Sequence, residues 1–224
     1  MSRGQNQPAS FTPAAGHALL TPAYDLGVRL LTRERRWREA LLDQIAPGDG
    51  ETILDVGCGT GTLAVLLKRR APGVRVLGLD PDPQALALAA AKARRAGVQI
   101  DWRQGVAPDA ACLGRFDHVV SSLVFHQVPP DGKIAGLSAM FAALRPGGAL
   151  HIADYCRQPD RLMRGLFAII QALDGRRNTQ ANADGAVEQI LEQLGGRPLQ
   201  PQRTVRTPTG AISLLRLDKD GRTL

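Results

Sequence analysis

The sequence predicts an α/β fold, built on one mostly parallel β-sheet with helices on both of its faces. Short runs of β-branched and aliphatic residues alternate with longer segments whose apolar residues recur at helical spacing, as in βαβ units. The first such run ends in a glycine-rich turn, ILDVGCGTG at 53–61. Two last strand-like runs, at 202–206 and 211–216, flank Thr-Pro-Thr-Gly and predict an antiparallel hairpin that completes seven strands.

Length and composition indicate one domain. The chain has 224 residues, 44% of them hydrophobic, which is enough for one sizeable core. No apolar run reaches the roughly 18 residues of a membrane span, and residues 1–17 lack the apolar centre of a signal peptide, which predicts a cytoplasmic protein. The three cysteines lie far apart, so neither a disulfide framework nor a metal site is indicated.

The net charge of +7 raises the question of nucleic acid, because a basic face attracts phosphate. The excess of basic over acidic residues is spread along the chain, and the one compact cluster of arginines, at 33–38, is interrupted by Glu34. This distribution favours a solvated helix face. We therefore expect a small-molecule substrate and no nucleic-acid partner.

The N-terminal part of the chain changes character near residue 19. Residues 1–18 are rich in Ser, Gln, Pro and Gly and are expected to form a mobile tail. Apolar residues at helical spacing then predict one or two amphipathic helices over 19–46, headed by Tyr24 and Asp25. A single domain is expected over 19–224.

The glycine-rich turn predicts a nucleoside cofactor. Residues 53–56 form a short buried strand, and the glycines after it let the backbone lie against a ligand at the start of the next helix. Asp80 ends the next apolar run, where its carboxylate can accept hydrogen bonds from both hydroxyls of a ribose. An NAD site needs a third glycine at position 62, where Thr62 stands, so the NAD interpretation is weakened.

The other elements follow from the same patterns. An alanine-rich run predicts a helix whose start is set by two prolines, and Gly-Gly at 195–196 indicates a helix end. The segment 174–184 gives no clear signal and is expected to be a loop. The expected elements are strands at 74–79, 98–102, 116–120 and 149–155, and helices at 60–70, 84–96, 130–144, 161–173 and 186–194.

The glycine spacing resembles a known motif. Gly-x-Gly-x-Gly, with Asp55 two residues before it, resembles motif I of the class I S-adenosylmethionine (SAM) methyltransferases. Asp80, the strand at 116–120 and Leu-Arg-Pro-Gly-Gly-Ala-Leu at 144–150 extend the match. Order and spacing most resemble the ubiquinone and menaquinone biosynthesis C-methylases, the UbiE-like group, over roughly residues 20–217. The resemblance implies a Rossmann-like fold and SAM as the cofactor.

The resemblance also implies cofactor-binding residues. Asp55 would bind the methionine ammonium of SAM, and Asp80 would hold its ribose. The family has Asp or Asn where Val106 stands, so adenine would be held by backbone groups there, or by Trp102 or Arg103. The full implied set is Asp55, Gly57, Cys58, Gly59, Thr60, Asp80, Pro81, Val106, Ala107 and Ser122.

The implied activity is methyl transfer to a carbon or oxygen of a small, partly apolar acceptor by in-line displacement. Orientation supplies on the order of 7–11 kcal/mol of barrier reduction in well-aligned reactions. In the resembled family the N-terminal helices cover the cofactor, so 19–46 would be a lid, and 157–185 would be a substrate cap. The alternatives are a SAM-binding protein without transferase activity and a nucleic-acid methyltransferase. For the latter, neither Asn/Asp-Pro-Pro-Tyr nor Pro-Cys follows the strand at 116–120.

A general base is needed only if the acceptor must lose a proton. His126, Tyr24 and Asp154 are the candidate catalytic residues. His126 follows the strand at 116–120 by a few residues and is expected to face the cleft. It would either fix its own loop or accept a proton from the acceptor, for which an ordinary histidine pKa is well placed.

Overall fold

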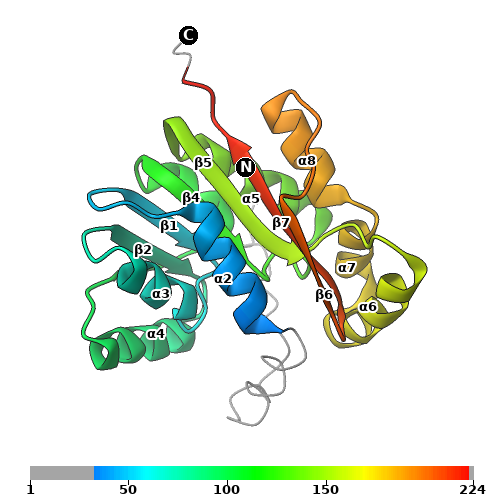
Figure 1. Cartoon of the computed structure of the whole chain (residues 1–224), viewed down its shortest axis with the longest axis horizontal. Coiled ribbons are helices and arrows are strands. Elements are labelled where there is room, and N and C mark those ends of the chain that lie inside the picture. Colours follow the sequence, from blue (N-terminus) through cyan, green and yellow to red (C-terminus); the bar gives the residue numbers. More distant parts are fainter. Residues whose placement is uncertain (1–32, 222–224) are drawn as a thin grey trace, which may run out of the picture.

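The computed structural model describes residues 33–221, which form a seven-stranded sheet flanked by helices (Figure 1). The strands are β1 (Thr52–Val56), β2 (Arg75–Asp80), β3 (Asp101–Gln104), β4 (Phe116–Ser122), β5 (Leu144–Tyr155), β6 (Arg203–Thr207) and β7 (Gly210–Asp218). The helices are α2 (Glu34–Ile45), α3 (Thr62–Arg70), α4 (Pro83–Ala96), the short 3₁₀ helix η1 (Ala107–Cys112), α5 (Pro130–Ala142), α6 (Arg161–Asp174), α7 (Arg176–Ala183) and α8 (Ala186–Gly195).

The sheet has the order β3-β2-β1-β4-β5-β7-β6. The first five strands in chain order pair in parallel, whereas β7 runs antiparallel to both β5 and β6. The predicted fold class is thereby confirmed, including the C-terminal hairpin. The chain reverses its direction of progress across the sheet between β1 and β4, which is where open α/β sheets bind ligands.

Strand residues alternate between two cores because successive side chains point to opposite faces of a sheet. In β1, Ile53 packs in the core beneath α2 and α3, whereas Leu54 packs in the core beneath α5 and α8. Trp37 of α2 is fully buried in the first of these cores. Helices therefore cover both faces (Figure 1).

Local chemistry sets the helix boundaries. The carboxylate of Asp82 accepts the backbone N–H of Gln84 at 2.8 Å and caps α4, and Gly97 ends that helix in the left-handed region. Asp160 caps α6 in the same way, through the N–H of Met163 at 2.9 Å. Within the described residues, no helix is both long and apolar enough to cross a membrane.

Three predicted segments were wrong in detail. The fifth strand begins at Leu144, inside the segment predicted to be helical, and not at Ala149. The segment expected to be a loop after α6 contains α7, whose polar sequence hides a buried face made by Thr179, Asn182 and Ala183. The third strand starts at Asp101 rather than at Val98, because its pairing partners on β2 begin with Leu77 opposite Asp101.

Candidate active site

The carboxyl ends of the central parallel strands bring the predicted residues to one edge of the sheet. Asp55 lies near the end of β1, Asp80 ends β2, Ser122 ends β4, and Asp154 lies near the end of β5. The strand order reverses at this edge, between β1 and β4. The structure thus brings together residues that are up to 99 positions apart in the sequence.

The glycine-rich turn is fixed against β2. The backbone N–H groups of Gly57 and Cys58 both donate to the carbonyl of Leu79, at 2.8 and 3.1 Å. Gly57, Gly59 and Gly61 all have positive φ, a conformation that L side chains rarely adopt. A Cβ on Gly59 would meet no atom within 4 Å, so this position opens to free space beside the turn.

Asp55 is the most unusual group at this edge. Its side chain is fully buried, and neither of its carboxylate oxygens has a hydrogen-bond partner among the described residues. Burial, reinforced by the nearby Asp80 and opposed by Arg38, raises the pKa of Asp55 to about 7. A buried carboxylate without a partner is costly. It fits a cationic ligand group such as an ammonium.

Asp80 is held in place by the turn itself. One of its oxygens accepts the N–H of Gly59 at 2.7 Å, and the other accepts the N–H of Asp82 at 3.0 Å. Burial raises the pKa of Asp80 above its ordinary value, against these two hydrogen bonds. A carboxylate has about four acceptor positions, so two remain for ligand hydroxyls.

We expect Asp80→Ala to weaken binding of SAM and of its demethylated product by about 1–3 kcal/mol, because hydrogen bonds to a charged acceptor disappear. Calorimetry measures both affinities. Asp82→Ala serves as a control, since it removes the carboxylate that caps α4 and keeps the backbone N–H that Asp80 accepts. SAM affinity that does not respond to Asp80→Ala, or tight NAD binding, would contradict the assignment.

The other turn residues lie beside Asp80. Cys58 is buried, and burial raises the pKa of its thiol well above the ordinary value, so it stays protonated. The Thr60 hydroxyl accepts from the Lys92 ammonium at 2.9 Å. Pro81 follows Asp80, and its carbonyl accepts the side-chain amide of Gln104 at 3.1 Å.

The loop predicted to contact adenine has an acidic side chain that sequence reasoning missed. Asp109 accepts the backbone N–H of Val106 at 2.8 Å, two residues beyond Ala107, at the start of η1. The Val106 side chain is 42% exposed at this loop. The ring of Trp102 packs against the glycine-rich turn and β2, because a Cβ on Gly61 or on Gly78 would lie within 2.6 Å of it.

The turn after β4 lies against the glycine-rich turn. Ser122 is half-buried, and Leu123 after it has a φ of 56°, a strained value for a leucine. A Cβ on Gly57 would lie 2.3 Å from Val124 Cγ2, so the two turns are in direct contact. The strained residue, Leu123, thus lies between the end of β4 and His126.

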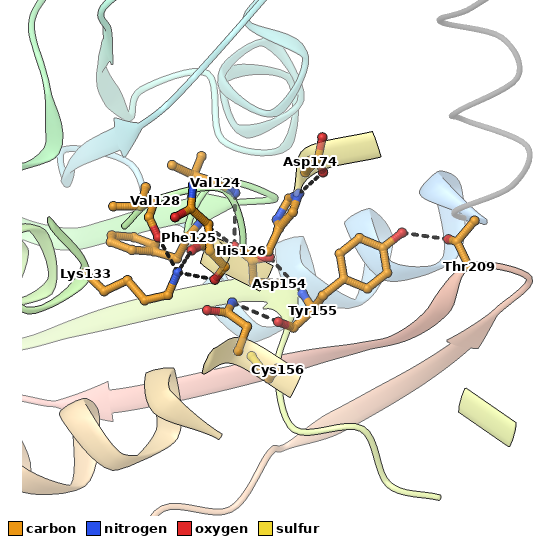
Figure 2. Close-up of polar contacts among 12 residues, drawn as sticks. Val124, Phe125, His126, Val128, Lys133, Asp154, Tyr155, Cys156, Asp174 and Thr209 are labelled. Atoms are coloured by element: carbon orange, nitrogen blue, oxygen red, sulfur yellow. Dashed lines mark hydrogen bonds and ion pairs between the residues drawn. The ribbon is translucent and has the colours of Figure 1, made fainter. Parts of the chain in front are cut away.

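Asp154 organises the residues around His126 (Figure 2). Asp154 is 1% exposed and accepts the backbone N–H groups of Val124, Phe125 and Tyr155 at 2.7–3.0 Å. It also lies 2.7 Å from Nδ1 of His126. His126 is therefore buried against the sheet rather than exposed in an open cleft.

A second carboxylate reaches His126 from the end of α6. Nε2 of His126 lies 3.3 Å from Oδ2 of Asp174, the last residue of α6. Burial lowers the pKa of His126, but the Asp154 and Asp174 carboxylates outweigh this effect and raise the pKa to about 9. The imidazole is thus charged at neutral pH. From the sequence we expected an ordinary histidine pKa, which would leave it mostly neutral.

Lys133 was not predicted, because lysines are rarely buried. Its side chain is fully buried, and its ammonium donates to the carbonyls of Phe125 at 2.6 Å, of Val128, and of Asn178 at 3.1 Å. Burial lowers the pKa of Lys133 to about 8. This lysine ties the loop that carries His126 to α7. Tyr24, the third predicted catalytic residue, lies outside the described residues.

Known proteins with similar sequences are methyltransferases. A family model described as "Methyltransferase domain" matches residues 53–148. The demethylmenaquinone methyltransferase of Thermus thermophilus is 34% identical over 157 residues, 67% of this chain and 67% of that protein. The ubiquinone/menaquinone biosynthesis C-methyltransferase UbiE of Paracoccus denitrificans is 33% identical over 139 residues, 59% of this chain and 54% of that protein. The chain thus spans between about half and two thirds of these relatives.

Solved structures share the fold. The magnesium protoporphyrin IX methyltransferase ChlM of Synechocystis PCC 6803, with bound S-adenosylhomocysteine (SAH), has a TM-score of 0.66 at 20% identity, over 92% of this chain and 90% of that one. The site fits the same cofactor, because Asp55, which has no hydrogen-bond partner within residues 33–221, suits an ammonium and Asp80 suits a ribose. The chain therefore belongs to the class I SAM-dependent methyltransferases of the UbiE-like group, and its cofactor is SAM.

Proposed function

We propose that this chain transfers the methyl group of SAM to a carbon or an oxygen of a small, partly apolar acceptor. The buried Asp55 carboxylate carries this proposal, because it lacks any hydrogen-bond partner among the described residues and lies at the edge where such sheets bind ligands. Bound SAM supplies an electrophilic methyl group, so an electron pair of the acceptor forms the new bond while the sulfur leaves as a neutral thioether.

The protein's own contribution is to hold the ligands. In this proposal the residues that the resemblance implies, from Asp55 to Ser122, bind the cofactor, and the glycine-rich turn lies between Asp55 and Asp80 in the sequence. We assign residues 19–46 as a lid, of which 19–32 lie outside the described residues, and 157–185 as the substrate cap, which contains α6 and α7. Apolar side chains exposed on α6 support a partly apolar acceptor; they are Leu162, Ile169 and Leu173.

The test uses the whole chain and SAM with a labelled methyl group. Incubation with a low-molecular-weight, apolar extract of cells should transfer the label to a small molecule and release SAH in equal amount. Binding of SAM without any label transfer would instead favour a SAM-binding protein. Transfer of label to RNA or DNA in preference to the small molecules would contradict the proposed acceptor class.

His126 is the described side chain that we propose to act on the acceptor, with Asp154 as its positioning residue. We expect His126→Asn to lower the turnover rate by roughly 10²–10⁴-fold, because a charged hydrogen-bond donor is removed from the reacting group. Rate measurements at saturating SAM, with SAM affinity from calorimetry, check this. Affinity for SAM should change little.

The matched control is His118→Asn. His118 lies at the other end of β4, where its Nδ1 is 3.1 Å from His151 Nε2. This variant loses a partly buried histidine hydrogen bond far from the carboxyl edge, so its melting temperature should fall while its turnover is retained. If His126→Asn behaves like His118→Asn, His126 only stabilises its loop.

A further inference from the structure

A cavity of about 240 Å³ lies between α8 and the hairpin of β6 and β7. Helix α8 packs beside β7 at the C-terminal side of the sheet (Figure 1). The remaining wall comes from the segment between β5 and α6 and from the segment that leads into β6. Neither His126 nor any residue that the resemblance assigns to the cofactor lines this cavity. It is therefore a second place at which a ligand can bind.

Two glutamates of α8 line the cavity. Glu188 and Glu192 are four residues apart, so their side chains share one face of the helix. Oε1 of Glu188 accepts the backbone N–H of Arg157 at 2.8 Å, and Oε1 of Glu192 accepts the backbone N–H of Leu199 at 3.0 Å. Within residues 33–221, the other oxygen of each carboxylate, Oε2, has no hydrogen-bond donor. Each glutamate thus keeps one free acceptor.

Glu188 is the less satisfied of the two glutamates. It is 7% exposed, and burial raises its pKa against the hydrogen bond from Arg157. A buried carboxylate oxygen without a donor is costly. Arg157 also lines the cavity, but its guanidinium lies against Gly185, where an added Cβ would be 2.7 Å from Nε, and in the described part of the chain it forms no ion pair with either glutamate. The wall therefore carries an excess of negative charge.

The rest of the cavity limits the size and the kind of ligand. The hydroxyls of Thr204 and Ser213 lie 3.3 Å apart, and Leu199 and Pro201 add apolar surface. A volume of about 240 Å³ holds roughly eight water molecules and is below the roughly 300–1,000 Å³ of drug-sized sites, so the ligand must be small. No group of three or more His, Cys, Asp or Glu within residues 33–221 is placed to hold a metal ion. An organic cation fits better.

We propose that this cavity binds the protonated amino group of a small aliphatic amine. An ammonium has three N–H donors, which match the Oε2 atoms of the two glutamates and one of the two hydroxyls. The short carbon chain of the amine packs against Leu199 and Pro201. Together with the Arg157 guanidinium, the bound ammonium balances the two carboxylates, so the wall no longer carries an excess of negative charge.

The experiment titrates the full chain with n-butylamine and follows backbone amides by NMR. The amides of Arg157 and Leu199 are the reporters, because they donate to the two glutamates. At about pH 8 the amine is protonated and carboxylates are ionised. We expect both amides to shift and saturate, with a dissociation constant on the order of 1 mM. 1-Butanol has the same chain without the charge and should bind at least about tenfold more weakly.

Two substitutions rank the glutamates. Glu188→Gln keeps an acceptor for the Arg157 N–H and loses the charge, so butylamine binding should weaken at least about tenfold. Glu192→Gln should weaken it only about two- to fivefold, because Glu192 is half-buried and solvent screens its charge. The control is Asp184→Asn, which removes a surface carboxylate that pairs with Arg164 at 2.8 Å just before α8. It should leave butylamine binding unchanged.

Circular dichroism verifies that each variant is folded. The proposal is overturned if butylamine leaves the two reporter amides unmoved, if 1-butanol binds as tightly as butylamine, or if Glu188→Gln binds butylamine as tightly as wild type. It is also overturned if Ca²⁺ shifts both amides at a lower concentration than butylamine does, because the cavity is then a metal site. Each of these outcomes leaves the proposed methyl transfer untouched, since the cavity shares no residue with the implied cofactor set.

Discussion

Replacement of Asp55 by Asn should weaken SAM binding by roughly 10²- to 10⁴-fold, because a cationic ligand group loses the buried carboxylate that pairs with it. The same change should stabilise the ligand-free protein by about 1–4 kcal/mol, since an unpaired buried carboxylate disappears. Affinity and stability therefore move in opposite directions. Calorimetry measures the first quantity and thermal unfolding the second.

The pKa of Asp55 adds a pH dependence with a definite sign. Its ordinary value is 3.8 and its value in the fold is about 7, so the folded protein keeps a proton that the unfolded chain has lost between these limits. Stability should therefore fall as pH rises from about 4 to about 7 and then level off. SAM binding favours the ionised form, so affinity should rise over the same range, with proton release.

The control for Asp55 is Asp43→Asn, because Asp43 is 64% exposed and pairs with Arg70 on the surface. It should change neither SAM affinity nor the pH profile. If Asp55→Asn binds SAM as tightly as wild type, or if the affinity of the wild-type protein is the same at about pH 5 and about pH 8, the ammonium assignment is wrong.

The second large effect concerns two glycines of the same turn. Gly61→Ala should lower the free energy of unfolding by about 2–5 kcal/mol, from left-handed strain of about 1–2 kcal/mol and overpacking of about 1–3 kcal/mol. Its new Cβ would lie 2.6 Å from the Trp102 ring and 2.8 Å from the Cβ of Ala89. Chemical denaturation measures the loss.

Gly59→Ala is the matched variant, because φ is again positive but the added methyl meets no atom within 4 Å. It should lose only the strain term, about 1–2 kcal/mol, while its methyl enters the space proposed for the cofactor and lowers SAM affinity at least about tenfold. Gly50→Ala, with φ of 85° and equally open space away from the turn, measures the strain alone. Equal stability losses at the three positions would contradict this account.

Sequence patterns predicted the strands and the turn around Asp55 and Asp80 well because the signals for them are local. A buried strand, a run of glycines and an acid at the next strand end lie within 28 residues, from 53 to 80, and each is visible without knowledge of the fold. The parallel pairing of β1 with β2 then brings Asp55 and Asp80 to one edge. In β1 and β2 only the strand ends differ from the prediction, because pairing with the neighbouring strand decides where a strand ends.

The surroundings of His126 could not be predicted in the same way. Asp174 is 48 positions away and belongs to α6, so its contact with His126 depends on how α6 packs on the sheet. Lys133 and the buried face of α7 are polar, and a polar sequence pattern normally indicates a solvent-exposed surface. Their burial is made possible by backbone carbonyls that accept from Lys133 and from Asn182, which donates to the Tyr155 carbonyl at 2.9 Å.

The proposed substrate cap has a consequence for how the acceptor preference of such an enzyme evolves. Residues 157–185 form one unbroken stretch, whereas the proposed cofactor residues all lie between 55 and 122. The cap is fastened partly through main-chain carbonyls, for example by the Asn178 side chain to the Gln127 carbonyl at 2.9 Å, and such carbonyls persist whatever side chains surround them. If 157–185 is the substrate cap that we propose, a single recombination of this stretch should change the acceptor preference and leave the proposed SAM-binding residues in place.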